Sequence, residues 1–437
     1  MKSKLFLYTL AGALGTLIVG CGTGVTGNAA AAANRTSSPP VTLTLWQNYG
    51  TEAEATATNA LVKAFEKSHP SIKIHVVSQP ANNYFPLLQA SAISRTGPDI
   101  TVMWTGLYAL KYKNFLLNLN HYIPLSSLKQ MNGIKWASDQ FNPSKGVYVM
   151  PLENQFYIGF YNKALFKKAG IKSPPATWAQ LYTDARVLKA HGINPLLYGS
   201  GSQNLGSEFY PYYDLSYLMI GLYPVSKWKE LYSGQIPWTS PAIAQQLTKW
   251  VQLKQKGFTN ANVLTDYNSL GQFEKGKAAM LIKGNWDLKS LEQAMGSKLG
   301  VFVPPYSNSK IHGVVEFPGD GYSVTKYSQH KPQAIAFLKF LMSPQAQQIE
   351  ANNGLIPDRV GATTRDPLSN QMLAFASKKG FVQYPMIDNV TQPEVVNAGS
   401  KVLDAAFGGT MTVKAALQNL QSTLQQLPSN ERSANYK

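Results

Sequence analysis

Residues 41–77 read VTLTLWQNYGTEAEATATNALVKAFEKSHPSIKIHVV. The first six residues alternate polar and apolar side chains and are rich in β-formers, which predicts a strand over 41–46. The apolar spacing then predicts a helix from about Glu52 to Lys67, and Pro70 ends it. A second strand is predicted over 72–77. Strand, helix and strand at this spacing predict a βαβ unit with a parallel sheet.

The same alternation continues along the chain. Further strands are predicted over 97–103, 157–161, 279–282 and 299–303, and further helices over 178–191, 242–256, 270–276 and 332–353, the last interrupted at Ser343-Pro344. No internal repeat of fixed period is found. The chain is therefore of the α/β class, and its 437 residues are too many for one compact core, so we expect two domains.

The N-terminus has the pattern of an export signal. Lys2 and Lys4 precede an apolar stretch that is shorter than the roughly 20 residues a spanning helix needs, so a signal peptide over 1–20 is expected. The end of this stretch, Ile18-Val-Gly-Cys21, resembles the bacterial lipobox. That resemblance implies cleavage before Cys21, the only cysteine, and a lipid anchor on its thiol. The alternative is an ordinary signal peptide with an incidental cysteine. Residues 21–40 are small and polar and are predicted to be a tether.

The charge balance is basic, with 40 Lys+Arg against 23 Asp+Glu and a formal net charge of +17. Charged residues make up only 14%, below the usual figure of about 25%. The lysines are scattered, with no basic run longer than two residues, so no nucleic-acid partner is expected. Two readings remain open: a cationic surface facing an anionic envelope, and adaptation to an acidic habitat, where few carboxylates means little stability lost on protonation.

Several short stretches occur in an order that carries a family resemblance. They are Gly97-Pro-Asp-Ile100, Pro151-Leu-Glu-Asn-Gln155, Tyr161 to Gly170, Pro174 to Trp178, Phe273 to Met280, Gly284-Asn-Trp286, Ser323 to Leu341 and Gly354-Leu-Ile-Pro357. Together they resemble the extracellular solute-binding proteins of ABC importers, in the carbohydrate-binding group that includes maltose-binding protein. Each stretch alone is a weak signal, whereas the ordered set is specific.

The resemblance implies a two-lobed, periplasmic-binding-protein-like (type II) α/β fold with a hinge and an interlobe cleft. It places 41–152 plus 320–369 in the N-terminal lobe and 153–319 plus 370–437 in the C-terminal lobe. It further implies a monomeric, non-catalytic protein without cofactor or metal, held on the extracellular face of the cytoplasmic membrane. Such a protein captures a sugar by hinge closure and delivers it to the transmembrane subunits of an ABC permease.

The resemblance also suggests which side chains line the cleft. They are Asn48, Tyr49 and Glu52 in the turn after the first strand, the aromatic Trp104, Tyr212 and Trp286, the hydrogen-bond acceptors Glu153 and Gln155, and Asp320 with Tyr322. Aromatic rings stack on sugar faces, and carboxylates accept hydrogen bonds from sugar hydroxyls. Trp286 has core packing as its alternative role, and Asp320 and Tyr322 have turn formation as theirs. The family's aromatic residue aligns with Met103 rather than with Trp104.

Other chemistries find less support. Gly271 to Lys277 matches most of a phosphate-binding loop, but Ala278 replaces the required Ser/Thr. The six histidines show no ligand spacing, so no zinc site is predicted, and no Gly-x-Ser-x-Gly elbow is present.

One departure from the maltose-binding pattern and two alternative functions stay open. Pro393-Glu-Val-Val396 lacks the aromatic residue that some maltodextrin binders have there. The basic charge permits an anionic ligand, such as an acidic sugar or glycerol phosphate. A surface glycosidase is the other alternative, with Glu153 and a second carboxylate as its acid–base pair.

Overall fold

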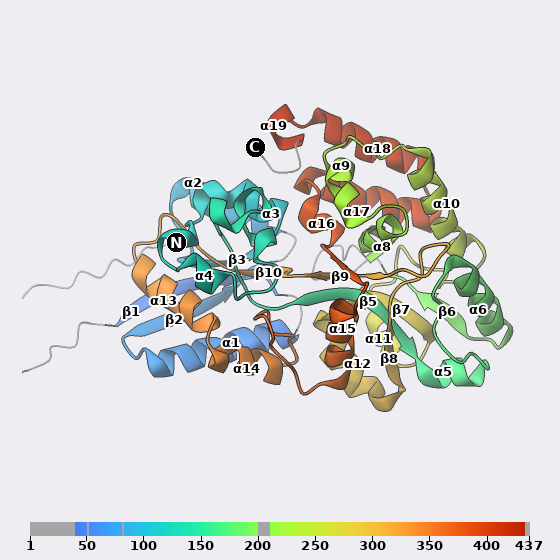
Figure 1. The fold of residues 1–437 in the computed structure, drawn as a ribbon, viewed down its shortest axis with the longest axis horizontal. Helices are drawn as coiled ribbons and strands as arrows, with labels where there is room; N and C mark the ends of the chain where they lie inside the picture. The colour runs from blue at the N-terminus through green and yellow to red at the C-terminus, as the bar shows by residue number, and fades with distance from the viewer. Residues whose placement is uncertain (1–39, 50–51, 81–82, 200–209, 433–437) are drawn as a thin grey trace, which may run out of the picture. The chain divides into compact units, whose positions relative to one another are not determined.

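The computed structural model describes residues 40–49, 52–80, 83–199 and 210–432, without the side chains of residues 52, 210 and 211. These residues form two β-sheets covered by helices (Figure 1). The predicted signal peptide, lipidation at Cys21 and almost all of the tether lie outside the described residues.

The first sheet has the strand order β2-β1-β3-β10-β4. Its strands are β1 (Val41–Gln47), β2 (Ile72–Ser78), β3 (Ile100–Trp104), β4 (Met150–Pro151) and β10 (Asp320–Val324). β1 runs parallel to both β2 and β3, and α1 (Glu52–Ser68) connects β1 to β2, which confirms the predicted βαβ unit. β10 is antiparallel to β3 and β4, because the chain returns to this sheet from the opposite direction.

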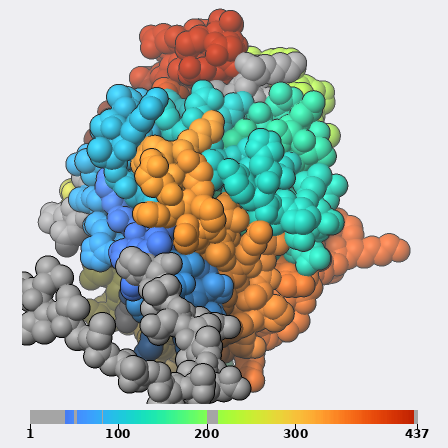
Figure 2. Space-filling view, turned by 90° about the vertical axis from the view of Figure 1, so that its left-hand side faces the viewer, coloured from blue at the N-terminus to red at the C-terminus, as the bar shows by residue number. Residues whose placement is uncertain are grey.

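The core beneath the first sheet joins segments that are far apart in the sequence. Leu43 and Phe65 are fully buried in one cluster with Phe337. Phe337 belongs to α13 (Lys331–Leu341), which is followed by α14 (Pro344–Asn352). Figure 2 shows the orange surface of residues 331–352 against the blue and cyan surface formed by the first part of the chain. The remaining helices of residues 83–128 are α2 (Tyr84–Ser94), α3 (Leu107–Tyr112) and α4 (Leu125–Leu128).

The predicted break between two helices near residue 343 is present, and its cause is local. The hydroxyl of Ser343 accepts a hydrogen bond from the backbone N–H of Ala346 at 3.2 Å and so caps α14. Pro344 occupies the first helical position, where its missing N–H costs nothing.

The second sheet has the strand order β11-β9-β5-β7-β6, and β8 pairs with β5 outside this path. Its strands are β5 (Gln155–Asn162), β6 (Asn194–Leu197), β7 (Ala278–Gly284), β8 (Leu299–Phe302), β9 (Gly313–Phe317) and β11 (Val382–Tyr384). β5 is antiparallel to β7, β8 and β9, whereas β6 is parallel to β7.

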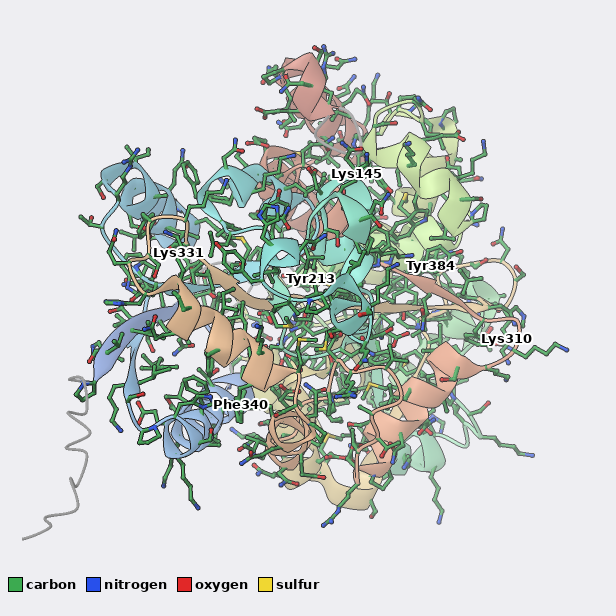
Figure 3. All side chains as sticks on the ribbon, turned by 60° about the vertical axis from the view of Figure 1, so that its left-hand side comes forward. Lys145, Tyr213, Lys310, Lys331, Phe340 and Tyr384 are labelled. Carbon is green, nitrogen blue, oxygen red and sulfur yellow. The ribbon has the colours of Figure 1, made fainter. Side chains whose placement is uncertain are left out.

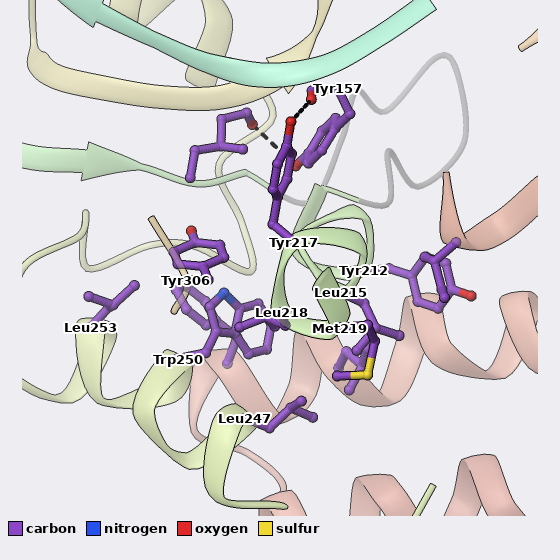
Figure 4. Close-up of a cluster of buried hydrophobic side chains, with 14 of the residues drawn as sticks. Tyr157, Tyr212, Leu215, Tyr217, Leu218, Met219, Leu247, Trp250, Leu253 and Tyr306 are labelled. Atoms are coloured by element: carbon purple, nitrogen blue, oxygen red, sulfur yellow. Dashed lines mark hydrogen bonds between the residues drawn. The ribbon is translucent and has the colours of Figure 1, made fainter. Parts of the chain in front are cut away.

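Helices accompany the second sheet on both faces. They are α5 (Lys163–Lys168), α6 (Trp178–Ala190), α7 (Tyr210–Tyr213), α8 (Leu215–Ile220), α9 (Trp228–Tyr232), α10 (Pro241–Gln255), α11 (Ser269–Glu274), α12 (Leu288–Met295), α15 (Pro367–Ser377), α16 (Ile387–Val390), α17 (Pro393–Gly408), α18 (Val413–Gln426) and α19 (Ser429–Arg432). The largest buried cluster fills one face of this sheet (Figure 4). The stretch that resembled a phosphate-binding loop contributes most of α11.

The chain crosses between the sheets twice within a few residues each time, from β4 at Pro151 to β5 at Gln155, and from β9 at Phe317 to β10 at Asp320. A third segment lies beside the first crossing, because the N–H of Asn154 donates to the carbonyl of Ile356 at 2.7 Å. Three neighbouring stretches of backbone therefore connect the parts of the chain that form the two sheets.

The surface carries the basic charge noted in the sequence. Lys310 projects away from the protein in Figure 3, and most described lysines are exposed or half-exposed. Among the described residues, none of the helices has the length and apolar character needed to cross a membrane.

Candidate functional site

Three carboxylates from three separate parts of the chain meet at the crossings between the sheets. Glu54 lies in the first turn of α1, Glu153 lies between β4 and β5, and Asp320 begins β10. One oxygen of each lies within 4.8 Å of the others. The side chains are almost completely buried, with relative exposures of 5%, 0% and 7% respectively. We refer to Glu54, Glu153 and Asp320 as the hinge carboxylates.

The topology explains why these residues meet. β1 and β3 are parallel, so their carboxyl ends lie at one edge of the first sheet, where ligands of open α/β sheets bind. Asp320 pairs with Trp104 in the antiparallel ladder and therefore lies at that edge. Gly321 pairs with Pro151, and the chain leaving β4 then brings Glu153 to the same place.

The amide of Gln155 is the hydrogen-bond donor between the carboxylates. Its Nε2 donates to Oε1 of Glu153 at 3.0 Å and lies 3.5 Å from Oε1 of Glu54. Oε2 of Glu153 and Oδ1 of Asp320 are buried and make no hydrogen bond within the described part of the chain. The neutral amide thus lies against two of the three acidic groups, and acceptor atoms of Glu153 and Asp320 remain available.

Burial and mutual repulsion both act on the protonation of this cluster. Burial, together with the neighbouring Glu54 and Asp320, raises the pKa of Glu153 well above its ordinary value. Burial and the nearby Glu54 likewise raise the pKa of Asp320. Two unit charges within 4.8 Å repel by at least about 3 kcal/mol at an effective dielectric constant near 20. The cluster therefore favours any partner that brings protons, hydrogen-bond donors or positive charge.

Two tyrosines lie beside the carboxylates. The hydroxyl of Tyr322 is 2.7 Å from Oγ1 of Thr58 on α1, and its ring meets that of Tyr49 edge-on, with centroids 6.4 Å apart. Burial and then the charge of Asp320 raise the pKa of Tyr49 well above its ordinary value. Tyr322 is fully buried in the core of the first sheet, so its hydroxyl contacts Thr58 from the core side of α1.

Two half-buried tryptophans end strands on either side of the crossings. Trp104, the last residue of β3, packs against Phe85 and Tyr108 with ring centroids 4.9 Å away in each case. Trp286 lies in the single 3₁₀ turn η8 (Asn285–Asp287) directly after β7 and meets the edge of Tyr213 at 6.2 Å. Both indoles keep partly exposed surface, as a ring that stacks on a ligand requires.

A hydrogen bond from the backbone to a side chain fixes the position of the turn that carries Trp286. Oδ1 of Asn285 accepts a hydrogen bond from the backbone N–H of Phe156 at 2.7 Å. Because Phe156 follows Gln155, the same bond ties η8 to the start of β5. η8 also contacts α1, which carries Glu54.

The remaining predicted residues have different positions. Tyr212 is fully buried, and a Cβ on Gly399 of α17 would lie 2.4 Å from its ring, so it packs in the core of the second sheet (Figure 4). Asn48 lies with Tyr49 in the turn after β1 and is 9% exposed. Glu52 is the first residue of α1, and its side chain is outside the described residues.

Two residues of the site were missed from the sequence. Glu54 lies on the buried face of α1, in line with Thr58 and Leu61, so helical periodicity could have favoured it over Glu52. Tyr213 stands next to the predicted Tyr212 and is the residue that reaches Trp286. A run of consecutive tyrosines gives no signal to separate the two.

Comparison with known proteins identifies the family. Residues 49–348 match the bacterial extracellular solute-binding proteins. An ABC transporter extracellular-binding protein of Pyrococcus horikoshii is 23% identical over 406 residues, covering 88% of this chain and 83% of that protein. The multiple sugar-binding protein of Streptococcus mutans is 23% identical over 312 residues, covering 69% of this chain and 71% of that protein.

Solved structures give the same fold. A chitin oligosaccharide binding protein superposes with a TM-score of 0.77 at 23% identity, covering 88% of this chain and 98% of that one. Maltose-bound MalE3 of T. maritima superposes with a TM-score of 0.72 at 20% identity, covering 88% and 99%. The predicted two-lobed α/β fold and the predicted family are thereby confirmed. The chain belongs to the bacterial extracellular solute-binding proteins.

Proposed function

We propose that this solute-binding protein captures a carbohydrate, most simply an oligosaccharide, and delivers it to the transmembrane subunits of an ABC permease. The observation that carries the proposal is the position of the hinge carboxylates, Gln155 and the two strand-end tryptophans at the crossings between the sheets. Carboxylates accept hydrogen bonds from hydroxyls, and indoles stack on the C–H faces of sugar rings.

The names of several relatives support a sugar as the solute. They include the multiple sugar-binding protein and, among the structures, proteins described as binding chitin oligosaccharide and maltose. A relative named as a glycerol-3-phosphate-binding protein, from Brucella abortus, is 26% identical over 164 residues, which cover only 34% of this chain. Three buried carboxylates oppose an anionic solute, so a carbohydrate is the better fit.

Capture in this proposal works by hinge closure. The lobes are residues 41–152 with 320–369 and residues 153–319 with 370–437, and the hinge is the group of crossing segments around Glu153 and Asp320. A solute held between the lobes stabilises the closed form by its greater affinity for that form. The permease then distinguishes the closed surface from the open one.

The anchoring belongs to the same proposal. A lipid on Cys21 would hold the protein on the extracellular face of the cytoplasmic membrane, with residues 22–40 as the tether. A diacylglyceryl group supplies the two alkyl chains that stable anchoring requires. Metabolic labelling with a fatty-acid analogue tests this, because a Cys21→Ser variant should lose the label.

A surface glycosidase is the second candidate, and one observation favours it. Retaining glycosidases place two carboxyl groups about 5–5.5 Å apart, and the hinge carboxylates likewise bring several carboxyl groups together, with one oxygen of each within 4.8 Å of the others. We favour binding without catalysis because the family consists of solute-binding proteins. Chromatography of each saccharide after prolonged incubation separates the two, since any shortened product means catalysis.

The test of the proposed function is a thermal-unfolding screen of residues 41–437 against neutral and acidic mono- and oligosaccharides. A ligand at 100 times its Kd stabilises the bound form by about 2.7 kcal/mol, which corresponds to a rise of roughly 2–4 °C for lobes of this size. A rise with one saccharide class and no product supports the proposal. A rise only with phosphates or free amines and with no saccharide would overturn it.

A further inference from the structure

The hinge carboxylates carry more acidic character than binding a neutral sugar requires. One carboxylate is enough to accept hydrogen bonds from two neighbouring hydroxyls. Here Glu54, Glu153 and Asp320 converge within 4.8 Å, from three segments that the fold brings together. Hydroxyl groups donate hydrogen bonds but bring no net charge, so they leave the mutual repulsion of the three groups in place.

The orphaned oxygens give a second and separate indication of a missing partner. Glu153 is completely buried and Asp320 is 7% exposed, yet Oε2 of the former and Oδ1 of the latter have no hydrogen-bond partner within the described residues. Buried polar atoms in native proteins are normally satisfied, and each exception calls for an explanation, of which a bound ion or ligand is one. The uncharged amide of Gln155 donates to Oε1 of Glu153 and lies 3.5 Å from Oε1 of Glu54, so it brings hydrogen bonds but no positive charge to the cluster.

We propose that the hinge carboxylates hold a positive charge that accompanies the solute, so that this protein selects a cationic carbohydrate. The inference rests on the proposed function and names the solute class of the same site. A protonated amine on a sugar presents three N–H donors, which matches three acceptor groups. A Ca²⁺ ion bridging the carboxylates to sugar hydroxyls supplies the same charge, since Ca²⁺ prefers carboxylate and hydroxyl oxygens. The shared chemistry is a cation held by Glu54, Glu153 and Asp320.

The experiment compares matched probes on the same protein by isothermal titration. A chitosan tetramer carries an amine on every sugar, and the chitin tetramer is its neutral N-acetylated counterpart. Each is titrated at neutral pH in EDTA and again in millimolar CaCl₂, and CaCl₂ is also titrated alone. A protonated amine as the source predicts at least tenfold tighter binding of the chitosan tetramer in EDTA. Ca²⁺ as the source predicts that CaCl₂ binds alone and tightens binding of the chitin tetramer at least tenfold.

Two isosteric variants show whether the charge acts at this site. Glu153→Gln and Asp320→Asn keep the shape of each side chain, and circular dichroism verifies their folding. Each should reduce the chitosan preference, or the Ca²⁺ effect, to less than threefold. Glu431→Gln in α19 is the matched control and should change neither.

The outcomes are distinguishable. Equal binding of both tetramers with no Ca²⁺ effect would overturn the cationic solute and leave the proposed carbohydrate function standing. If the preference for chitosan or the effect of Ca²⁺ persists in both isosteric variants, the cation binds elsewhere on the protein, and its assignment to the hinge carboxylates is overturned. If neither tetramer nor CaCl₂ binds, the inference fails, and the wider saccharide screen decides separately whether the proposed function fails with it.

Discussion

Gly319 and Gln155 are packed so closely that a side chain at position 319 would displace the amide of Gln155. A Cβ added to Gly319 would lie 1.5 Å from Oε1 of Gln155 and 2.9 Å from the ring of Phe317. The glycine therefore leaves room for the amide of Gln155, which in turn donates to Glu153. The backbone at one crossing between the sheets thus positions a side chain at the other crossing.

Gly319→Ala should weaken solute binding through Gln155. We expect the added methyl to displace the amide, break its 3.0 Å bond to Glu153 and raise the Kd about tenfold, as expected for a lost hydrogen bond to a charged group. Titration calorimetry measures the change. In a Gln155→Ala background the methyl no longer meets the amide, and only the ring of Phe317 at 2.9 Å must adjust, so Gly319→Ala should then cost less affinity. Equal losses in both backgrounds would mean that the glycine acts through the backbone alone.

Trp286→Ala should weaken binding without destabilising the fold. The indole is half-buried and makes an edge contact with Tyr213 at 6.2 Å, so its removal opens no large internal cavity. Loss of a stacked aromatic ring raises the Kd about tenfold. Fluorescence titration measures the change in affinity, and thermal unfolding measures the change in stability. Tyr122→Ala, which removes a partly exposed ring from the first lobe, serves as the control. A large drop in Tm with unchanged affinity would assign Trp286 to the core.

Asp214→Ala should strongly destabilise the second lobe. This fully buried carboxylate accepts hydrogen bonds from three tyrosine hydroxyls and the indole of Trp250, at 3.0 Å for the latter and 2.8 Å for Tyr306. Alanine would remove the acceptor that these four buried donors share, a loss of about 3–5 kcal/mol. Urea unfolding measures it. Asp184→Ala on α6 should change stability by less than about 0.5 kcal/mol. Similar values for the two variants would contradict the network's structural role.

Stability should fall as the pH rises from acidic to mildly basic. Glu350 and Asp358 are fully buried and neither carboxyl has a hydrogen-bond partner among the described residues, and burial raises the pKa of both well above ordinary values. Burial also raises the pKa of Asp388 to about 7 and that of Asp404 to about 8. The folded state therefore keeps protons that the unfolded chain releases above pH about 4.

The sign follows from this difference in bound protons. The stabilisation is complete below the unfolded carboxyl pKa and is lost as the pH rises toward the raised values, by about 1.4 kcal/mol per pH unit for each group. Tm measured from pH 4 to pH 8 should decline. Glu350→Gln should flatten the decline, since an amide needs no proton, and Glu431→Gln should leave it unchanged. A Tm that rises toward pH 8 would refute this account. A measured decline would favour the interpretation that the protein is adapted to an acidic habitat.

Local patterns predicted the first βαβ unit and several later strands and helices, but not the strands β9 and β10 through which the chain returns from the second sheet to the first. Alternation and apolar spacing located β1, α1 and β2, and the capped break between α13 and α14 followed from Ser343-Pro344. β9 and β10 were not predicted as strands, because their residues are buried on both faces and show no alternation. The antiparallel insertion of β10 beside β3 depends on pairing between distant segments, which no local pattern reports.

The site shows the same limit. Tyr49, Glu153, Gln155 and Asp320 were selected through the family resemblance, and the structure brings them together. The proximity of Glu54 to Asp320 depends on two crossings that bring distant residues within 4.8 Å of each other, so the charge of the cluster could not be read from spacing.

The most direct test of carbohydrate capture between the lobes is one titration series. The saccharide that raises Tm most is titrated into the wild-type protein and into the Gln155→Ala/Trp286→Ala double variant, which changes the first crossing and the turn after β7. Effects at separate positions add, so we predict about a 100-fold rise in Kd with the Tm of the free protein nearly unchanged. Unchanged affinity in the double variant would contradict the account, because the solute would then bind elsewhere.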